Sequence, residues 1–264
     1  PFCARAIAAE APAGPPPATA KSKSKVPVET LIDSRKGPKE PLSREPDGWP
    51  SILVAVFRDP ILAAFDRLHA DQPERPLVAS ASRLATVAEV HRQTGQHAGR
   101  LHEHGLVPGR LVGLVAPNGP GFLVGYLALR RCGLVPVLCD LAVPPHALEG
   151  ILARFDVAGC LSLSDAWPRG GEHWTFVTRL GAVVRHLSET IGAIKLTSGS
   201  TGLPRGVVVS SAALVADEAQ LAASMGLTAE DRHIGAIPFS HSYGFSSVVL
   251  PSSFTVAWSA SAVG

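Results

Sequence analysis

Residues 197–206 read Thr-Ser-Gly-Ser-Thr-Gly-Leu-Pro-Arg-Gly, a run of hydroxyl side chains and glycines that ends beside a cation. An apolar segment at 191–194 precedes the run, and three valines at 207–209 follow it. Glycine lets the main chain approach a ligand closely, so backbone N–H groups and hydroxyls can surround an anion while the arginine neutralises it. The pattern predicts a polyphosphate-binding loop between two strands. Its candidate phosphate-binding residues are Thr197, Ser198, Gly199, Ser200, Thr201, Gly202 and Arg205.

The loop differs from the common P-loop, which reads G-x-x-x-x-G-K-[ST] and opens a helix. Taken alone, a Gly-Ser-Thr cluster more often marks a plain turn. The complete order resembles the ATP signature of the adenylate-forming (AMP-binding) enzymes, which include acyl-CoA synthetases, fatty-acyl-AMP ligases and peptide-synthetase adenylation domains. That family usually has lysine where this chain has Arg205, which keeps the charge but changes its geometry and hydration. Lys195 reads equally well as an ATP contact or as a surface charge at a strand end.

A second stretch, Ile-Pro-Phe-Ser-His-Ser-Tyr-Gly-Phe at 237–245, resembles the family's next motif. The resemblance implies that His241 is the catalytic residue beside the substrate carboxylate, and that Gly244 keeps the pocket wall thin. Taken alone, a loop histidine is more often a surface or structural residue. Ser240 beside His241 also leaves a Ser-His hydrolase open, although the sequence lacks the G-x-S-x-G elbow and adjacent side chains rarely face each other productively.

The scaffold before these motifs, residues 84–140, resembles the family's N-terminal layout of helix, turn, strand, helix and strand. Thr-Val-Ala-Glu at 86–89 reads as a capping box, and Gly105 can end the helix that it opens. Asn118 as a cap and Pro120 in the first turn predict the start of the next helix.

Apolar runs and turn signals place the other elements along the chain. Their alternation predicts an α/β fold with mostly parallel sheets flanked by helices. By the resemblance, this is the N-terminal portion of the large domain of an adenylate-forming enzyme. The predicted elements are helices at 60–69, 143–156 and 211–225, strands at 111–115, 134–138, 157–163 and 234–237, and irregular chain at 164–189.

Composition sets the wider limits. The 264 residues carry a net charge of +2, which gives no electrostatic case for nucleic-acid binding. Four cysteines without a C-x-x-C pair indicate neither a zinc site nor a disulfide framework. Without a long apolar span or a secretory signal, the expected location is cytoplasmic, with no transmembrane segment. Residues 1–48 are expected to be a disordered leader or linker, and 49–264 a partial AMP-binding domain truncated at its C-terminal side.

The resemblance implies ATP-dependent activation of a carboxylic acid, fatty or aromatic, to an acyl-adenylate, with ATP and Mg²⁺ as cofactors. The acyl group would pass to coenzyme A or to a carrier-protein thiol. The family's later motifs, Tyr-Gly-x-Thr-Glu, a ribose-binding Asp and a lysine on a mobile C-terminal domain, do not follow residue 251. The chain is therefore expected to be an incomplete fragment that adenylates poorly or not at all by itself. The alternative is a catalytically inactive remnant that at most binds nucleotide.

Overall fold

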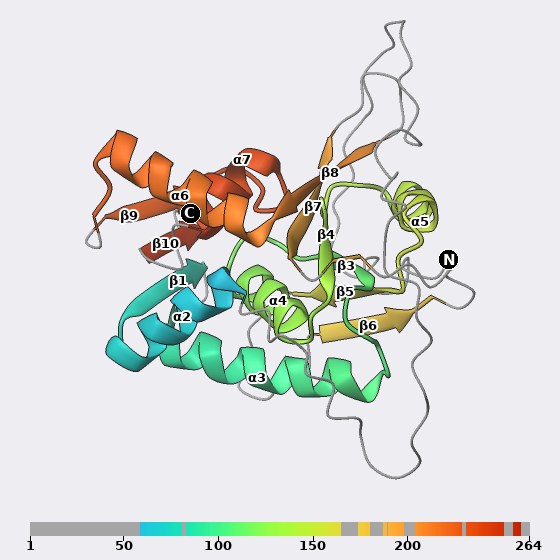
Figure 1. Ribbon diagram of the computed structural model, residues 1–264, viewed down its shortest axis with the longest axis horizontal. Helices are drawn as coiled ribbons and strands as arrows, with labels where there is room; N and C mark the ends of the chain where they lie inside the picture. Colours follow the sequence, from blue (N-terminus) through green and yellow to red (C-terminus); the bar gives the residue numbers. More distant parts are fainter. Residues whose placement is uncertain are drawn as a thin grey trace, which may run out of the picture.

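The computed structural model describes residues 59–80, 83–164, 174–179, 187–188, 190–197, 204–228, 231–250 and 256–259. The expected leader at 1–48 and loop residues 198–202 therefore lie outside the described residues. Within them the chain forms two sheets with helices packed around them (Figure 1). This arrangement confirms the predicted α/β class with mostly parallel sheets.

The larger sheet has the strand order β6-β5-β3-β4-β7-β8. Its four inner strands are parallel, and the two edge strands run antiparallel to their neighbours. The carboxyl ends of the inner strands therefore share one edge of the sheet. The strands are β3 (Leu111–Val115), β4 (Val135–Cys139), β5 (Gly159–Leu163), β6 (Trp174–Thr178), β7 (Ile191–Thr197) and β8 (Arg205–Ser210).

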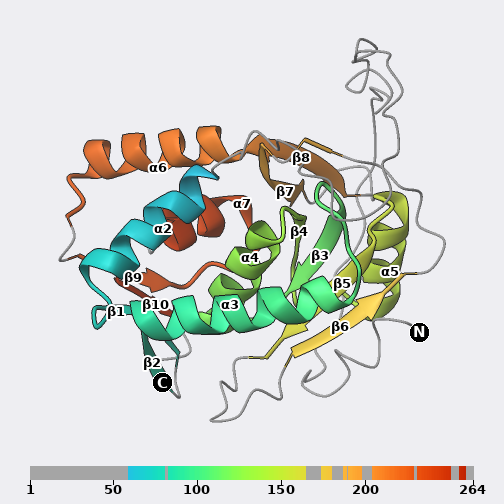
Figure 2. The same cartoon turned by 60° about the horizontal axis from the view of Figure 1, so that its bottom comes forward.

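Helices cover both faces of this sheet (Figure 2). On one face lies α4 (Pro120–Arg131), which α3 (Val87–Glu103) contacts along its length. On the other face, α5 (Pro145–Arg154) packs Leu148 and Leu152 against β3 and β4. Every residue of β3 and β4 is buried, as expected for parallel strands covered on both sides.

The smaller sheet has the order β2-β1-β10-β9, with β1, β10 and β9 parallel and β2 antiparallel to β1. Helix α2 contacts α3, α4 and α6, so a group of packed helices links the two sheets. The bounds are β1 (Pro76–Ser80), β2 (Arg83–Thr86), β9 (Arg232–Gly235), β10 (Val256–Ser259), α2 (Pro60–Asp71), α6 (Ser211–Met225), α7 (Ser242–Gly244) and the π-helix η2 (Phe245–Val249).

Local signals predicted several of these elements correctly. Thr86 and Glu89 form the expected capping box at the start of α3. Gly226 adopts the left-handed conformation, with φ of 66°, that ends α6. None of the helices in the described part of the chain combines the length and the hydropathy of a membrane span.

Two predictions about local structure were wrong. Asn118 does not cap α4, because Gly119 is the N-cap residue, at φ 141°, and the side chain of Asn118 bonds elsewhere. Part of the supposedly irregular segment 164–189 forms strand β6. There, the alternating aromatic residues Trp174 and Phe176 pack against the main hydrophobic core. An edge strand of five residues is too short to give a strong periodic signal.

Candidate active site

The two described ends of the predicted phosphate loop are held together by the β7–β8 hairpin. Thr197 ends β7 and lies directly opposite Arg205, which begins β8. The Thr197 hydroxyl donates to the carbonyl oxygen of Arg205 at 3.4 Å, and both side chains are exposed. The structure thus confirms that the loop joins two strands. The contacts of Ser198, Gly199, Ser200, Thr201 and Gly202 stay a prediction.

Gly206, the last residue of the motif, has a packing role. A Cβ atom at this position would lie 2.7 Å from Cε1 of Phe155 and 2.8 Å from Cγ2 of Ile194. The absence of a side chain lets the ring at the end of α5 approach β8 closely. This glycine therefore allows β8 to pack closely against Phe155 and Ile194.

His241 lies at the start of a compact turn formed by α7 and η2. It is the N-cap residue of α7, and its Nδ1 atom accepts a hydrogen bond from the Tyr243 N–H at 3.3 Å. In a neutral imidazole, the proton then resides on Nε2, which makes that atom a donor. The ring is exposed, so a small molecule can reach it.

The backbone of this turn explains Gly244. A Cβ atom there would lie 2.2 Å from the Pro238 carbonyl oxygen, which accepts a hydrogen bond from the His241 N–H at 2.9 Å. Glycine is required because the main chain doubles back on itself at this point. The proposed thin pocket wall is not needed to explain the residue.

Asn118 is a site residue that sequence reasoning assigned to the wrong role. Its side-chain amide donates to the carbonyl oxygens of Gly235 at 2.7 Å and Ile237 at 2.8 Å, and its Oδ1 atom accepts from the Phe239 N–H at 2.7 Å. Asn118 follows the carboxyl end of β3, so these bonds hold the segment that leads to His241 at that edge of the sheet. Its place three residues after the end of a buried strand was the available signal.

Helix α4 supports both parts of the candidate site. The Tyr126 hydroxyl lies 3.3 Å from the carbonyl oxygen of Gly192 in β7, to which it donates. The same ring packs edge-on against Phe245, with centroids 4.9 Å apart, and Phe122 contacts both Phe239 and Phe245. Burial raises the pKa of Tyr126 far above its usual value, so the hydroxyl stays protonated as a donor.

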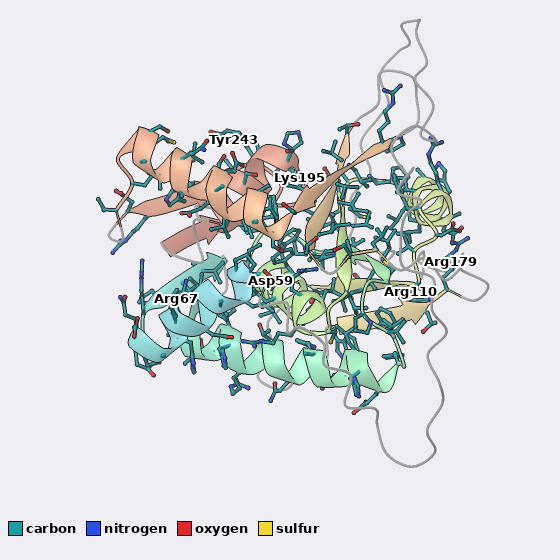
Figure 3. All side chains as sticks on the ribbon, viewed as in Figure 1. Asp59, Arg67, Arg110, Arg179, Lys195 and Tyr243 are labelled. Atoms are coloured by element: carbon teal, nitrogen blue, oxygen red, sulfur yellow. The ribbon has the colours of Figure 1, made fainter. Side chains whose placement is uncertain are left out.

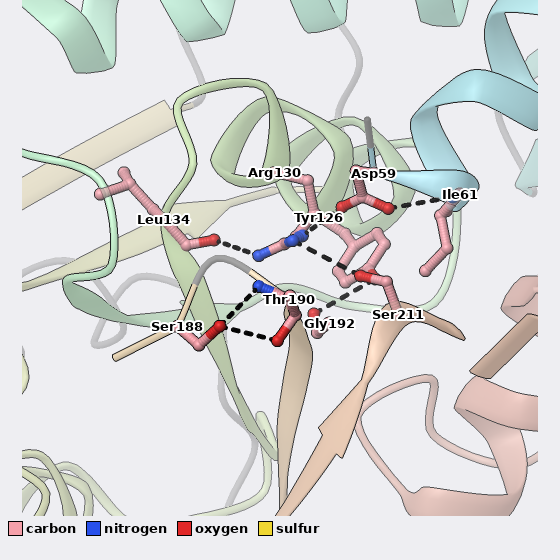
Figure 4. Close-up of polar contacts among 9 residues, drawn as sticks. All are labelled: Asp59, Ile61, Tyr126, Arg130, Leu134, Ser188, Thr190, Gly192 and Ser211. Atoms are coloured by element: carbon pink, nitrogen blue, oxygen red, sulfur yellow. Dashed lines mark hydrogen bonds and ion pairs between the residues drawn. The ribbon is translucent and has the colours of Figure 1, made fainter. Parts of the chain in front are cut away.

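A buried ion pair fixes the other end of α4 (Figure 4). Arg130 Nε lies 2.7 Å from Asp59 Oδ2, and the two side chains are 1% and 5% exposed. The guanidinium also donates to the Leu134 carbonyl oxygen at 2.8 Å and to the Ser211 hydroxyl at 3.4 Å. These bonds join the start of α2, the entry to β4 and the start of α6, and so fix the frame around β7.

The hydrolase alternative finds no support in this geometry. Ser240 is buried, and within the described chain no hydrogen bond joins its hydroxyl to the ring of His241. A nucleophile needs such a bond for its base to remove the proton. Nor do the described residues contain a group of three or more His, Cys, Asp or Glu side chains that could hold a metal ion.

Comparisons with known proteins place these features in a family. The chain is 30% identical over 164 residues to a linear gramicidin synthase of Brevibacillus parabrevis, and 29% identical over 157 residues to the pyochelin synthetase PchF of Pseudomonas aeruginosa. These matches cover 57% and 55% of this chain. They span 2% and 9% of the two synthetases, which are far longer.

Solved structures share the fold. The apo structure of MbtA from Mycobacterium smegmatis matches with a TM-score of 0.62 at 18% identity, over 75% of this chain and 43% of that one. The o-succinylbenzoate CoA synthetase of Bacillus subtilis, in complex with the acyl-adenylate intermediate OSB-AMP, matches with a TM-score of 0.60 at 18% identity, over 74% of this chain and 55% of that one. The chain thus spans about half the length of these proteins.

The family model of AMP-binding enzymes matches residues 65–190 and 184–254. These matches include the β7–β8 hairpin, the His241 turn and the Asn118 contacts that hold it. This chain belongs to the AMP-binding enzyme family.

Proposed function

We propose that this chain is the nucleotide-binding part of an enzyme that uses ATP to convert a carboxylic acid into an acyl-adenylate. One observation carries the proposal: Thr197 and Arg205, which flank the predicted phosphate loop, and the His241 turn lie at the same edge of the larger sheet. Thr197 ends one parallel strand there, and Asn118 fastens the turn beyond another. Ligands of open α/β sheets bind outside the carboxyl ends of the strands.

The reaction joins two anions, so its barrier is mainly electrostatic. A carboxylate oxygen attacks the α-phosphorus of ATP, and the bond from that phosphorus to pyrophosphate breaks. Arg205 and the N–H groups of the loop would neutralise the leaving phosphates. His241 would donate from Nε2 to the carboxylate or to the reacting oxygens. Mg²⁺ would arrive with the nucleotide phosphates, since the described residues offer no acidic cluster of their own.

The acid is proposed to be fatty or aromatic, and the acceptor to be the thiol of coenzyme A or of a carrier protein. An amino acid is the competing substrate. It is suggested by the two synthetases that resemble the chain, a linear gramicidin synthase and a pyochelin synthetase. The substrate assay must therefore include all three classes of acid.

The test combines ATP binding by calorimetry with acid-dependent exchange of pyrophosphate into ATP, measured on panels of fatty, aromatic and amino acids. Replacement of Arg205 by alanine is expected to weaken ATP binding about 10- to 100-fold, the range for a lost hydrogen bond to a charged group. Arg205→Lys should restore most of the affinity. Arg67→Ala, an exposed change on α2 (Figure 3), is the matched control and should leave binding unchanged.

Four results would separate the outcomes. Wild-type protein without measurable ATP affinity would refute the proposal, as would equal affinity in wild type and Arg205→Ala. ATP binding without exchange on any acid would reduce the function to nucleotide binding. The class of acid that supports exchange identifies the substrate.

A further inference from the structure

Lys195 is a buried cation close to the candidate site. It lies on β7, two residues before Thr197, and 6% of its surface is exposed. Lysine is almost never this buried unless its ammonium group has a partner. The structure therefore contradicts the reading of Lys195 as a surface charge at a strand end.

The contacts of Lys195 all point to the turn that carries His241. Its Nζ atom donates to the hydroxyl of Ser246 at 2.6 Å and lies 5.6 Å from the ring centroid of Phe245. The first contact is a charge-assisted hydrogen bond, and the second is within cation–π range. Both partners belong to η2, which follows α7 directly. Figure 3 shows Lys195 on β7, at the side of the sheet where α7 lies.

The strand geometry fixes this direction. Side chains alternate along a strand, so Lys195 shares a face with Ala193 and Thr197. Ala193 is fully buried in the same hydrophobic cluster as Phe245. The ammonium group of Lys195 therefore links β7 to η2, the helix that directly follows the one capped by His241.

The ammonium group of Lys195 has little compensating negative charge close to it. Burial lowers the pKa of Lys195, and Asp217 on α6 partly opposes that shift from a distance. Among the described residues, no carboxylate lies within ion-pair distance of Nζ, and Ser246 is its hydrogen-bond acceptor. Replacement of a buried ion by an apolar side chain of similar size is often neutral for stability. A simple gain in stability is therefore a weak explanation for this lysine.

We propose that Lys195 is a positioning residue, which holds the His241 turn in a fixed place relative to β7, the strand that leads into the predicted phosphate loop. The inference rests on the function proposed above. The link runs through one hydrogen bond, to Ser246, and one cation–π contact, to Phe245, so the end of β7 and the His241 turn keep one relative position. Misplacement of reacting groups by about 1 Å can cost a hundredfold in rate.

The test uses the intact protein with three variants: Lys195→Met, Ser246→Ala and the combination of both. In pyrophosphate exchange, each variant is expected to lower kcat about 10- to 100-fold, with the KM for ATP changed less than about twofold. The double variant should be no worse than either single one, because all three break the same bond. Ser246→Thr, which keeps the hydroxyl, should retain most of the wild-type kcat.

A second measurement does not depend on catalysis. Amide hydrogen exchange of residues 241–250 should become about 10-fold faster in Lys195→Met and in Ser246→Ala, since the loss of a charged hydrogen bond lowers the local opening free energy. Exchange in α3, which packs mainly against α4, serves as the internal control. Unchanged exchange at 241–250 in both variants would overturn the inference.

The failure of the inference and the failure of the proposed function give different results. If Lys195→Met raises the KM for ATP while Ser246→Ala has no effect, Lys195 contacts the nucleotide directly and the positioning role is wrong. If the wild-type protein shows no pyrophosphate exchange with any acid, the proposed function fails. Hydrogen exchange then still decides whether Lys195 holds the turn.

Discussion

The buried pair Asp59–Arg130 and the exposed pair Asp66–Arg131 form a matched comparison. Both pairs join α2 or its N-cap to α4, and each pairs an aspartate with an arginine. The side chains of the first pair are 5% and 1% exposed, whereas those of Asp66 and Arg131 are 46% and 24% exposed. Because burial sets the cost of an unpaired charge, the two aspartates should differ greatly in their effect on stability.

The magnitude for Asp59→Ala follows from two losses. Arg130 would keep its charge in the interior without its carboxylate, which costs about 3–5 kcal/mol. The Asp59 side chain also accepts from the Ile61 N–H at 2.9 Å as the N-cap of α2, worth about 1 kcal/mol. We expect a total of about 4–6 kcal/mol, a large part of a typical unfolding free energy. Asp66→Ala should cost about 0–1 kcal/mol.

Urea unfolding followed by circular dichroism measures both free energies by linear extrapolation. A third variant, Asp59→Asn with Arg130→Met, removes both charges, keeps the helix cap, and should recover much of the lost stability. The reasoning is refuted if Asp59→Ala destabilises the protein by less than about 1 kcal/mol, or by no more than Asp66→Ala.

Three further outcomes can be measured by the same unfolding experiment. Gly244→Ala should lower the free energy of unfolding by about 1–3 kcal/mol, because the new Cβ would meet the Pro238 carbonyl oxygen. Gly150→Ala lies at an open position of α5 and should instead raise the free energy of unfolding by about 0.5–1 kcal/mol. Asn118→Ala removes three hydrogen bonds and should cost about 2–3 kcal/mol, with the largest increase in amide exchange at 235–239. Burial lowers the pKa of His97 in the folded protein to about 4. As the pH falls below about 6.5, His97 is therefore protonated in the unfolded chain but still neutral in the folded protein. Stability should therefore fall by up to about 3 kcal/mol between pH 6.5 and 4, and His97→Phe should flatten that slope; an unchanged slope would contradict the assignment.

The elements that sequence predicted well are those whose signals are local. The capping box at Thr86 and the left-handed Gly226 each act within a few residues, so the start of α3 and the end of α6 could be read directly. The apolar run at 111–115 coincides with β3, because a strand buried on both faces is apolar throughout. The apolar runs at 191–194 and 207–209 likewise predicted the strands β7 and β8, although β8 is largely exposed.

The residues that were misread or missed have partners far away in the chain. Asp59 pairs with a residue 71 positions later, Asn118 with one 121 positions later, and Lys195 with one 51 positions later. Asn118 has the residue type of a helix cap and stands beside a helix start, so its local context favoured the wrong role. Which of these polar groups become buried is decided by the tertiary fold, which no local pattern contains.

These long-range contacts hold together segments that the sequence motifs leave separate. The motifs at 197–206 and 237–245 supply the groups that would contact ligands, but each lies on a separate segment. Helix α4 contacts both segments, through Tyr126 to β7 and through its aromatic rings to Phe239 and Phe245. Asn118 then holds the segment that precedes His241, and Lys195 holds the segment that follows it. The candidate site is therefore defined as much by the buried polar contacts that hold its two motifs together as by the motifs themselves.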